Sequence, residues 1–218
     1  MSEARDISID AVSEKDQSGG VRLRLLDSAE RLFGEHGVAE TSVRAITGAA
    51  GLNVALVNYH FGSKENLVRA VVERRQGALN TERLRRLDAC HSPTPDSDEI
   101  LKALAAPALQ VAFDHPYFAL LASRLRLAPD RSLWRDYRAG QQEVIARFGQ
   151  ALRGVLTHLD EDEVTARVHF VLGGIAHVWA HCPLPPEESP DTLLARFLTF
   201  YGAALRAPAP PPLPALFL

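Results

Sequence analysis

The sequence predicts an all-α protein in which an N-terminal unit of three helices precedes a larger helical domain. Apolar residues recur at helical spacing along the chain, and no stretch shows the alternation of apolar and polar residues that marks a half-buried β-strand. Between residues 41 and 67, three helix-start signals and two glycine stops follow one another closely. Such spacing leaves room only for short helices joined by tight turns.

The composition is that of a globular protein with a buried core. Hydrophobic residues make up 46% of the 218 residues and charged residues 23%, which argues against a disordered or fibrous chain. The net charge is −3, so the chain as a whole is not a general polyanion binder. Residues 21–90 nevertheless hold 11 Lys and Arg against 8 Asp and Glu. A basic segment on an acidic body favours a small DNA-binding unit joined to a larger domain.

The cysteines and the hydropathy pattern indicate a cytoplasmic protein with no membrane partner. Cys90 and Cys182 lack metal-finger spacing, which fits a reducing compartment. The first 20 residues are acidic and lack the apolar run of a signal peptide. The longest strongly apolar stretch, Val168–Ala180, contains two histidines and is too short to cross a bilayer.

The N-terminal part is expected to consist of an arm and four helices. Residues 1–20 are polar, end in two glycines and are expected to form a mobile arm. We expect a first helix over about residues 21–36, followed by helices over 42–51, 53–62 and 63–87. The expected N-caps of the last three are Ser42, Asn53 and Ser63, and the expected glycine stops are Gly37, Gly51 and Gly62.

The remainder of the chain is also predicted to be helical, after a turn-rich linker over residues 91–98. The expected helices are 99–113, a helix capped by Asp114 with Pro116 in its first turn, one long helix over 133–156, and helices over 160–181 and 190–206. The expected divisions are therefore an arm (1–20), a helix-turn-helix domain (21–67), a larger helical domain (68–206) and a proline-rich tail (207–218).

The third helix is the candidate for contact with DNA. At ~100° per residue, a helical wheel places Val54, Val57 and Phe61 on its buried side, so Tyr59 and its neighbours face outward. Such an outward face of apolar and amide side chains suits thymine methyls and adenine in a major groove. The expected DNA-contacting residues are Ser42, Val43, Arg44, Asn53, Ala55, Leu56, Asn58, Tyr59, His60 and Lys64.

Two segments carry a resemblance to a known family. They are LLDSAERLFGEHGVAETSVRAI and AGLNVALVNYHFGSKENLVRAVV, within residues 25–72, and they resemble the N-terminal DNA-binding domain of TetR-family transcriptional regulators. The Tyr-His-Phe end of the third helix and the following Ser-Lys-Glu-x-Leu carry most of the likeness. Asn58, where an aromatic is common, and Val43, where Thr is common, depart from the family pattern. The run from Val57 to Lys64 is similar to that of fatty-acid-responsive members.

The resemblance implies a repressor without a cofactor that binds a palindromic double-stranded DNA operator as a homodimer and is released by a small apolar or acyl-type effector. The family's last two long helices form its dimer interface. By that likeness, the interface residues here would be Val168, Val171, Leu172, Ile175, Leu194, Phe197, Leu198 and Tyr201. The residues expected to line the effector pocket are Phe113, Tyr117, Phe118, Leu121, Arg124, Leu125, Trp134 and Phe148.

Three other functions compete with this interpretation. His177 and His181, at i and i+4 with Cys182 adjacent, have a spacing that can bind a metal ion, so a metal-responsive regulator is one alternative. A helical protein-interaction module without DNA binding is another, although it leaves the capped 41–67 unit unexplained. The third alternative, an enzyme, is not expected, because the sequence holds no phosphate-binding glycine loop, nucleophile elbow or catalytic metal motif.

Overall fold

Ten helices and no strand make up the part of the chain that the computed structural model describes, residues 7–90, 96–125, 132–181 and 188–210. This arrangement confirms the predicted all-α class. The helices are α1 (Ile7–His36), α2 (Val43–Ala50), α3 (Ala55–Phe61), α4 (Lys64–Asp88), α5 (Ser97–Asp114), α6 (Pro116–Leu125), α7 (Ser132–Ala139), α8 (Gln142–Val155), α9 (Glu161–His181) and α10 (Pro190–Arg206).

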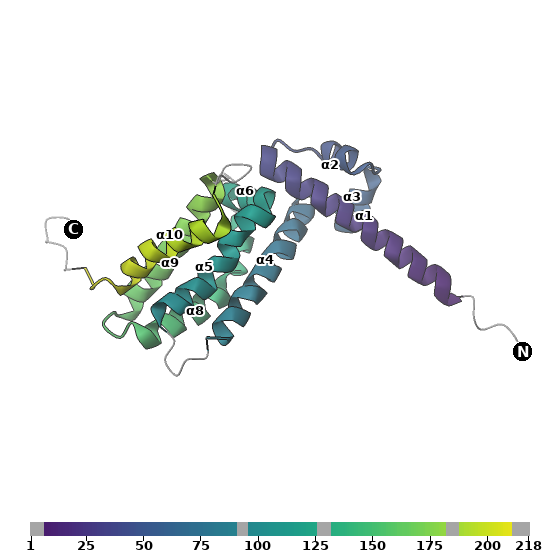
Figure 1. Cartoon of the computed structure of the whole chain (residues 1–218). Helices are drawn as coiled ribbons and strands as arrows, with labels where there is room; N and C mark the ends of the chain where they lie inside the picture. Colours follow the sequence, from purple (N-terminus) through teal and green to yellow (C-terminus); the bar gives the residue numbers. More distant parts are fainter. Residues whose placement is uncertain (1–6, 91–95, 126–131, 182–187, 211–218) are drawn as a thin grey trace, which may run out of the picture.

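The N-terminal helices form a small unit, called here the head (residues 21–67). In it α2 and α3 lie alongside the C-terminal half of α1 and against the start of α4 (Figure 1). Apolar side chains from all four helices close its core, because each helix turns one apolar stripe inward. These buried side chains are Leu25, Leu26, Ala29, Phe33, Ile46, Val57, Phe61, Leu67 and Val68.

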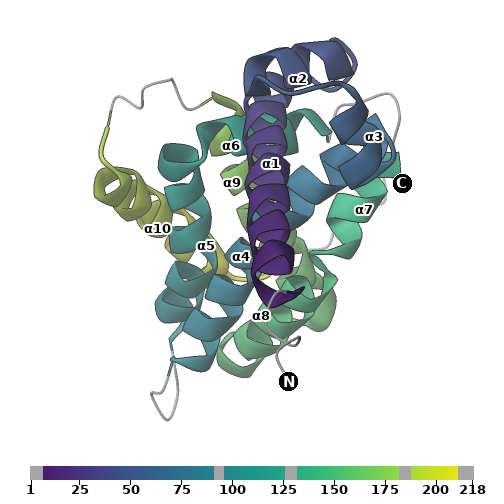
Figure 2. The ribbon, with the colours of Figure 1, turned by 90° about the vertical axis from the view of Figure 1, so that its right-hand side faces the viewer.

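The body (residues 68–206) is built around α5. This helix contacts α4, α6, α8, α9 and α10, and Figure 2 shows α10 beside it on one side of the molecule. Its composition explains its place, since small and apolar residues cover nearly its whole circumference and most of them are buried. The helix α4 runs from the head into the body, and α1 packs on α6. None of the helices in the described ranges is long and apolar enough to cross a membrane.

Several predicted helix boundaries are wrong. The first helix begins at Ile7 rather than near Val21, so residues 7–20 continue α1 instead of forming a separate arm. Asp114 is the last residue of α5 and accepts a hydrogen bond from Gln110, so it does not cap α6. Within α5, the helix begins at Ser97, two residues earlier than expected.

The predicted helix over residues 133–156 is broken into α7 and α8 at Gly140. The corner between them is pressed against α4. Asn80 donates a hydrogen bond to the carbonyl of Gly140 (2.7 Å), and a Cβ at Gly140 would lie 2.8 Å from Oε1 of Gln76. Contacts with a distant helix therefore decide this break, and local sequence does not reveal them. The predicted stop over residues 182–186 and most of the predicted tail lie outside the described residues.

Candidate nucleic-acid interface and ligand cavity

A tight turn joins α2 to α3. The hydroxyl of Ser42 accepts a hydrogen bond from the backbone N–H of Ala45 (3.1 Å) and so caps α2, as predicted. Gly51 then adopts the left-handed conformation (φ 63°, ψ 41°), and its N–H donates back to the carbonyls of Thr47 and Gly48. The side chain of Asn53 accepts from the N–H of Ala55 (2.9 Å), but Asn53 is not the N-cap as predicted, because Val54 occupies that position and provides no side-chain cap.

The seven-residue helix α3 is held at one face and open at the other. Val57 and Phe61 are buried in the head, whereas Tyr59 is 79% exposed and Asn58 and Ala55 are exposed beside it. The helical wheel gave the wrong exposure for two residues near this helix, Val54 and Leu56. Val54 is 41% exposed, because it lies just ahead of α3 and beyond the contact with the core. Leu56 is half-buried and packs against the core from the side.

Polar and cationic side chains flank this exposed face. Arg44 and Ser42 are exposed at the first turn of α2. His60 is half-buried, with its ring 4.9 Å from that of Tyr59 in an edge-to-face contact. Lys64 is half-buried, and its Nζ lies 3.5 Å from the carbonyl of Ala39. Whether these residues contact DNA remains a prediction.

The head is tied to α4 and to the body by buried charges. The carboxylate of Glu30, on α1, accepts hydrogen bonds from Arg74 (2.6 Å) and Arg75 (2.7 Å) of α4. Arg75 also contacts Nε2 of His115, between α5 and α6, at 3.2 Å. Burial, followed by the charge of Arg75, lowers the pKa of His115. Nearby, Gly34 packs directly on the backbone of Tyr117.

Most of the predicted effector-pocket residues are absent from the described wall of the cavity found in the body. Phe118, Leu121, Leu125 and Phe148 are fully buried and fill the core of the body. Such side chains have the same apolar character whether they fill a core or face a void, so composition did not separate the two cases.

The structure places three further predicted pocket residues outside the cavity. Phe113 is half-buried against the core, and Tyr117 contacts α1. Arg124 is exposed and donates to the carbonyl of Glu35 (3.1 Å), near the end of α1, so it lies at the contact between head and body. Trp134 alone among the predicted pocket residues lines the cavity of the body.

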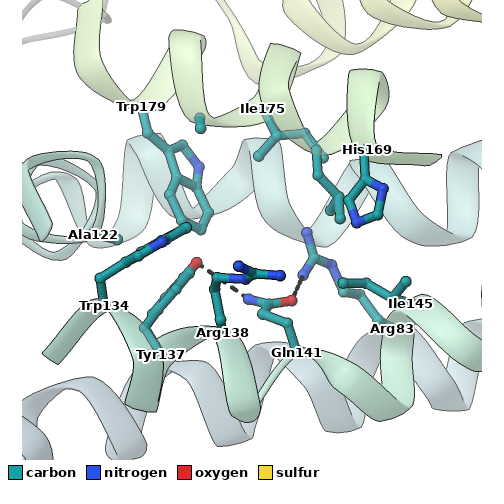
Figure 3. A pocket seen from close by; sticks show the side chains of 12 residues that line it. Arg83, Ala122, Trp134, Tyr137, Arg138, Gln141, Ile145, His169, Ile175 and Trp179 are labelled. Carbon is teal, nitrogen blue, oxygen red and sulfur yellow. Dashed lines mark hydrogen bonds between the residues drawn. The ribbon is translucent and has the colours of Figure 1, made fainter. Parts of the chain in front are cut away.

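That cavity has a volume of about 460 Å³ and lies between α4, α6, α7, α8 and α9 (Figure 3). Its wall combines two tryptophans and several aliphatic side chains with a few polar groups, the usual character of a small-molecule site. Leu172 and Ile175, predicted for the dimer interface, belong to this wall. The lining residues are Arg83, Ala122, Trp134, Tyr137, Arg138, Gln141, Ile145, His169, Leu172, Ile175, Ala176 and Trp179.

Arg83 is the charged group buried beside the cavity, with only 1% of its surface exposed. Its Nε donates to the carbonyl of Leu104 (3.0 Å), and one terminal nitrogen donates to Oε1 of Gln141 (3.3 Å). The amide nitrogen of Gln141 in turn donates to the hydroxyl of Tyr137 (3.2 Å), so the three side chains form a chain of hydrogen bonds (Figure 3). Burial lowers the pKa of Arg83 to about 10.

Arg83 is not among the residues predicted from the sequence, although the spacing along α4 contains a signal for it. Val72, Gln76, Leu79 and Arg83 follow one another at spacings of four, three and four residues, and all are buried on the inner face of α4. Polar residues within an apolar stripe mark either a buried network or a site. Here Gln76 donates to the backbone carbonyl of Tyr137 (2.7 Å) and so holds α7 on α4, and Arg83 lines the cavity.

Half of the predicted dimer-interface residues are buried within the single chain. Val168, Val171, Ile175 and Phe197 are at most 6% exposed, so nearly all of their surface is covered by this chain. Both long helices carry apolar residues on more than one side, and two of the predicted residues, Val171 and Tyr201, line a groove on the outer side.

The outer side of α9 and α10 carries a different apolar surface. Phe170 and Phe200 are each 68% exposed, and a groove beside them is lined by Gly173 and Gly174. The remaining predicted interface residues, Leu194, Leu198 and Tyr201, are half-buried.

The predicted metal ligands gain no support. The rings of His177 and His181 stack with their centroids 4.2 Å apart, and Nδ1 of His181 lies 3.0 Å from the carbonyl of His177. Cys182 lies outside the described residues. Among the residues described, no group of three or more His, Cys, Asp or Glu side chains is placed to hold a metal ion.

Comparison with known proteins gives matches at both ends of the molecule. Residues 25–71 match the family of bacterial regulatory proteins named tetR, and residues 102–204 match the tetracyclin repressor-like C-terminal domain. An HTH-type transcriptional repressor of Mycobacterium tuberculosis is 40% identical over 84 residues, 38% of this chain and 40% of the relative. The HTH-type transcriptional repressor KstR2 of Rhodococcus jostii is 47% identical over 55 residues, 24% of this chain and 27% of the relative. The chain thus matches less than half the length of these curated relatives.

Solved structures share the fold at low sequence identity. A TetR-like transcriptional regulator from Rhodococcus superposes with a TM-score of 0.67 at 17% identity, over 85% of this chain and 95% of the other. The fatty acid degradation regulator FadR of Bacillus halodurans superposes with a TM-score of 0.66 at 18% identity, over 82% and 96% of the two chains. At these identities the superpositions establish the common architecture of head and body.

Proposed function

Because the chain belongs to the TetR family of transcriptional regulators, we propose that it is a repressor that binds a palindromic operator as a homodimer. A small molecule in the cavity of the body releases it from DNA. The observation that carries the DNA-binding part is the exposure of Tyr59 on a helix whose other face, Val57 and Phe61, is locked in the head. A large aromatic side chain held rigidly outward suits contact with a groove rather than with water.

The homodimer follows from the need for two heads. One recognition helix reaches only a few base pairs, so affinity requires a second half-site about 34–36 Å away. Phe170 on α9 and Phe200 on α10 offer a surface for pairing with the same surface of a second chain. Gly173, beside which a Cβ would meet nothing within 4 Å, allows close approach of a second helix there. Sedimentation equilibrium at micromolar concentration should give twice the mass of 23.9 kDa, and a monomer mass would contradict this part.

The helix α4 offers a mechanical link from the cavity to DNA. Its first residue, Lys64, follows shortly after α3, the proposed DNA-reading helix. Arg83 lies 19 residues later at the cavity, about 28 Å along the helix axis. Asn80 and Gln76 also bind α7, which carries Trp134 of the cavity wall, to α4. An effector that shifts α7 or Arg83 therefore moves α4 and separates the two heads from successive major grooves.

A gel-shift titration tests the repressor function. The DNA is the region upstream of the gene for this protein, and the control is a duplex of equal length and composition with a shuffled sequence. We expect the upstream region to bind about a thousandfold more tightly, with a footprint of two half-sites. Equal binding to both duplexes would contradict the proposal.

The effector part has its own test. Compounds that raise the thermal unfolding temperature of the protein, and so bind its folded form, are added to the protein–operator complex. A tenfold loss of operator affinity requires only about 1.4 kcal/mol of differential binding. If every compound that occupies the cavity left operator binding unchanged, effector release would be wrong.

A further inference from the structure

The charges around the cavity point to the chemical class of the effector. We propose that the cavity binds an organic monocarboxylate, with the carboxylate on Arg83 and an apolar or aromatic body against Trp134 and Trp179. This inference rests on the proposed function, because it assigns a ligand to the cavity that the proposal uses for release from DNA.

Arg83 is a buried cation whose hydrogen-bond partners among the described residues are all neutral. Its side chain is almost wholly inaccessible, and its hydrogen-bond acceptors are the backbone carbonyl of Leu104 and the amide oxygen of Gln141, both neutral. No carboxylate in the described ranges forms an ion pair with it. A guanidinium has five N–H donors, and two of them are used in these bonds, so three remain for a ligand. A buried charge of this kind is costly unless a counter-ion joins it.

The other ionisable groups around the cavity favour the same sign of ligand. Arg138 and His169 line it as well, and the described lining residues include neither Asp nor Glu. The described part of the wall therefore offers positive or neutral groups and no negative one. A planar guanidinium with parallel N–H groups matches the two oxygens of a carboxylate. A doubly charged phosphate would need a second buried cation, and Arg83 is the only buried cation in the described wall.

The rest of the wall suits an apolar body of modest size. Trp134 stacks on Tyr137 with ring centroids 5.4 Å apart and planes 20° apart, which gives one flat side. The indole N–H of Trp179 donates to the carbonyl of Ala108 (2.7 Å) and fixes that ring as a second apolar surface. Ile175 continues the apolar wall between the aromatic rings and Arg83 (Figure 3). A volume of about 460 Å³ is within the range of small-molecule sites.

The two tryptophans of the chain both line the cavity, so intrinsic fluorescence reports directly on its occupation. The probes are phenylbutyrate and phenylbutanol, which share an apolar body and differ in charge. Titrated into the purified full-length protein without DNA, phenylbutyrate should bind at least tenfold more tightly than phenylbutanol. Isothermal titration calorimetry gives the same ratio without an optical signal.

Two variants assign the preference to a residue. Arg83→Met should bring the two affinities to within about threefold of each other. Arg138→Met, which removes one positive charge from an exposed side chain of the same wall, should keep the preference. Equal affinities for the two probes in the wild-type protein would overturn the proposal, and this comparison does not depend on either variant folding. A preference that survives Arg83→Met, or that is lost in Arg138→Met, would overturn the assignment to Arg83.

The outcome is separable from that of the gel shift. A protein that prefers phenylbutyrate but fails to bind the upstream DNA supports the carboxylate site and contradicts the repressor function. A protein that binds the upstream DNA but shows no preference for phenylbutyrate contradicts the carboxylate site alone.

Discussion

The contact between Gly34 and Tyr117 predicts that a single methyl group will disturb the docking of the head on the body. Gly34 lies near the end of α1, where that helix crosses α6. A Cβ at this position would lie 2.4 Å from the carbonyl oxygen of Tyr117 and 2.8 Å from its Cα, whereas such contacts are essentially never shorter than 3.0 Å. Gly34→Ala therefore requires the two helices to separate by at least 0.6 Å. Both clashing atoms belong to the backbone, so no side-chain rotation can relieve the overlap.

The size of the effect follows from two opposing terms. Replacing a glycine by alanine inside a helix stabilises it by about 1 kcal/mol, whereas overpacking a close contact costs about 1–3 kcal/mol. Gly77→Ala isolates the first term, because Gly77 is an exposed residue of α4 with nothing within 4 Å of the added Cβ. We expect Gly34→Ala to be about 1–3 kcal/mol less stable than Gly77→Ala.

Urea unfolding of the two variants and the wild type, followed by circular dichroism, measures this difference. Operator affinity should fall in Gly34→Ala and stay unchanged in Gly77→Ala, because only the first displaces the head relative to the body. A Gly34→Ala variant as stable as Gly77→Ala would show that α1 does not approach α6 this closely. The link between head and body would then have to depend on other contacts.

Four further variants test other parts of the molecule. Glu30→Gln should lower the free energy of unfolding by about 3 kcal/mol in urea titrations, because it leaves two arginines beside a buried neutral group. His115→Gln should reduce the loss of stability between about pH 7 and pH 5 in thermal melts. Burial and Arg75 lower the pKa of His115, so the unfolded chain takes up its proton first as the pH falls. Lys64→Ala should weaken specific and non-specific DNA binding alike and reduce the salt slope in anisotropy titrations by about one unit, and an unchanged slope would remove its phosphate contact. Phe200→Glu should convert the dimer to monomer in sedimentation experiments, and a persistent dimer would place the interface elsewhere.

The helix-turn-helix was predictable because its signals are local. Ser42 accepts a hydrogen bond from a residue three positions away, and Gly51 and Gly62 supply left-handed or related conformations that close the turns. Each of these features acts within one turn of the chain, and sequence spacing reports it directly. The exposed position of Tyr59 followed from the same spacing, since Val57 and Phe61 lie four residues apart on the buried side.

The cavity was not predictable in the same way because it depends on contacts between distant helices. Phe118 and Phe148 were expected to line it, yet they fill the core completely, whereas Trp179 forms part of its wall. Whether an apolar side chain faces a void depends on the separation of the helices around it. The break at Gly140 that positions α7 likewise depends on Asn80, 60 residues earlier in the chain.

The predicted dimer interface shows a third limit of sequence-based prediction. The helix α9 carries apolar residues on both its inner side, with Val168, and its outer side, with Phe170. Helical periodicity identifies a stripe but does not say which of two stripes packs on the same chain. Burial of the inner stripe by α5, α6 and α8 settles the question for the monomer.

Fluorescence anisotropy of wild-type protein and Tyr59→Ala tests most directly the claim that α3 reads DNA. Each protein is titrated into a labelled operator duplex and into a shuffled duplex of the same length, at one fixed salt concentration. We predict that Tyr59→Ala weakens operator binding at least tenfold, which is about 1.4 kcal/mol, and changes binding to the shuffled duplex by less than twofold. Unchanged operator binding, or an equal loss on both duplexes, would contradict the assignment of α3 as the sequence-reading helix.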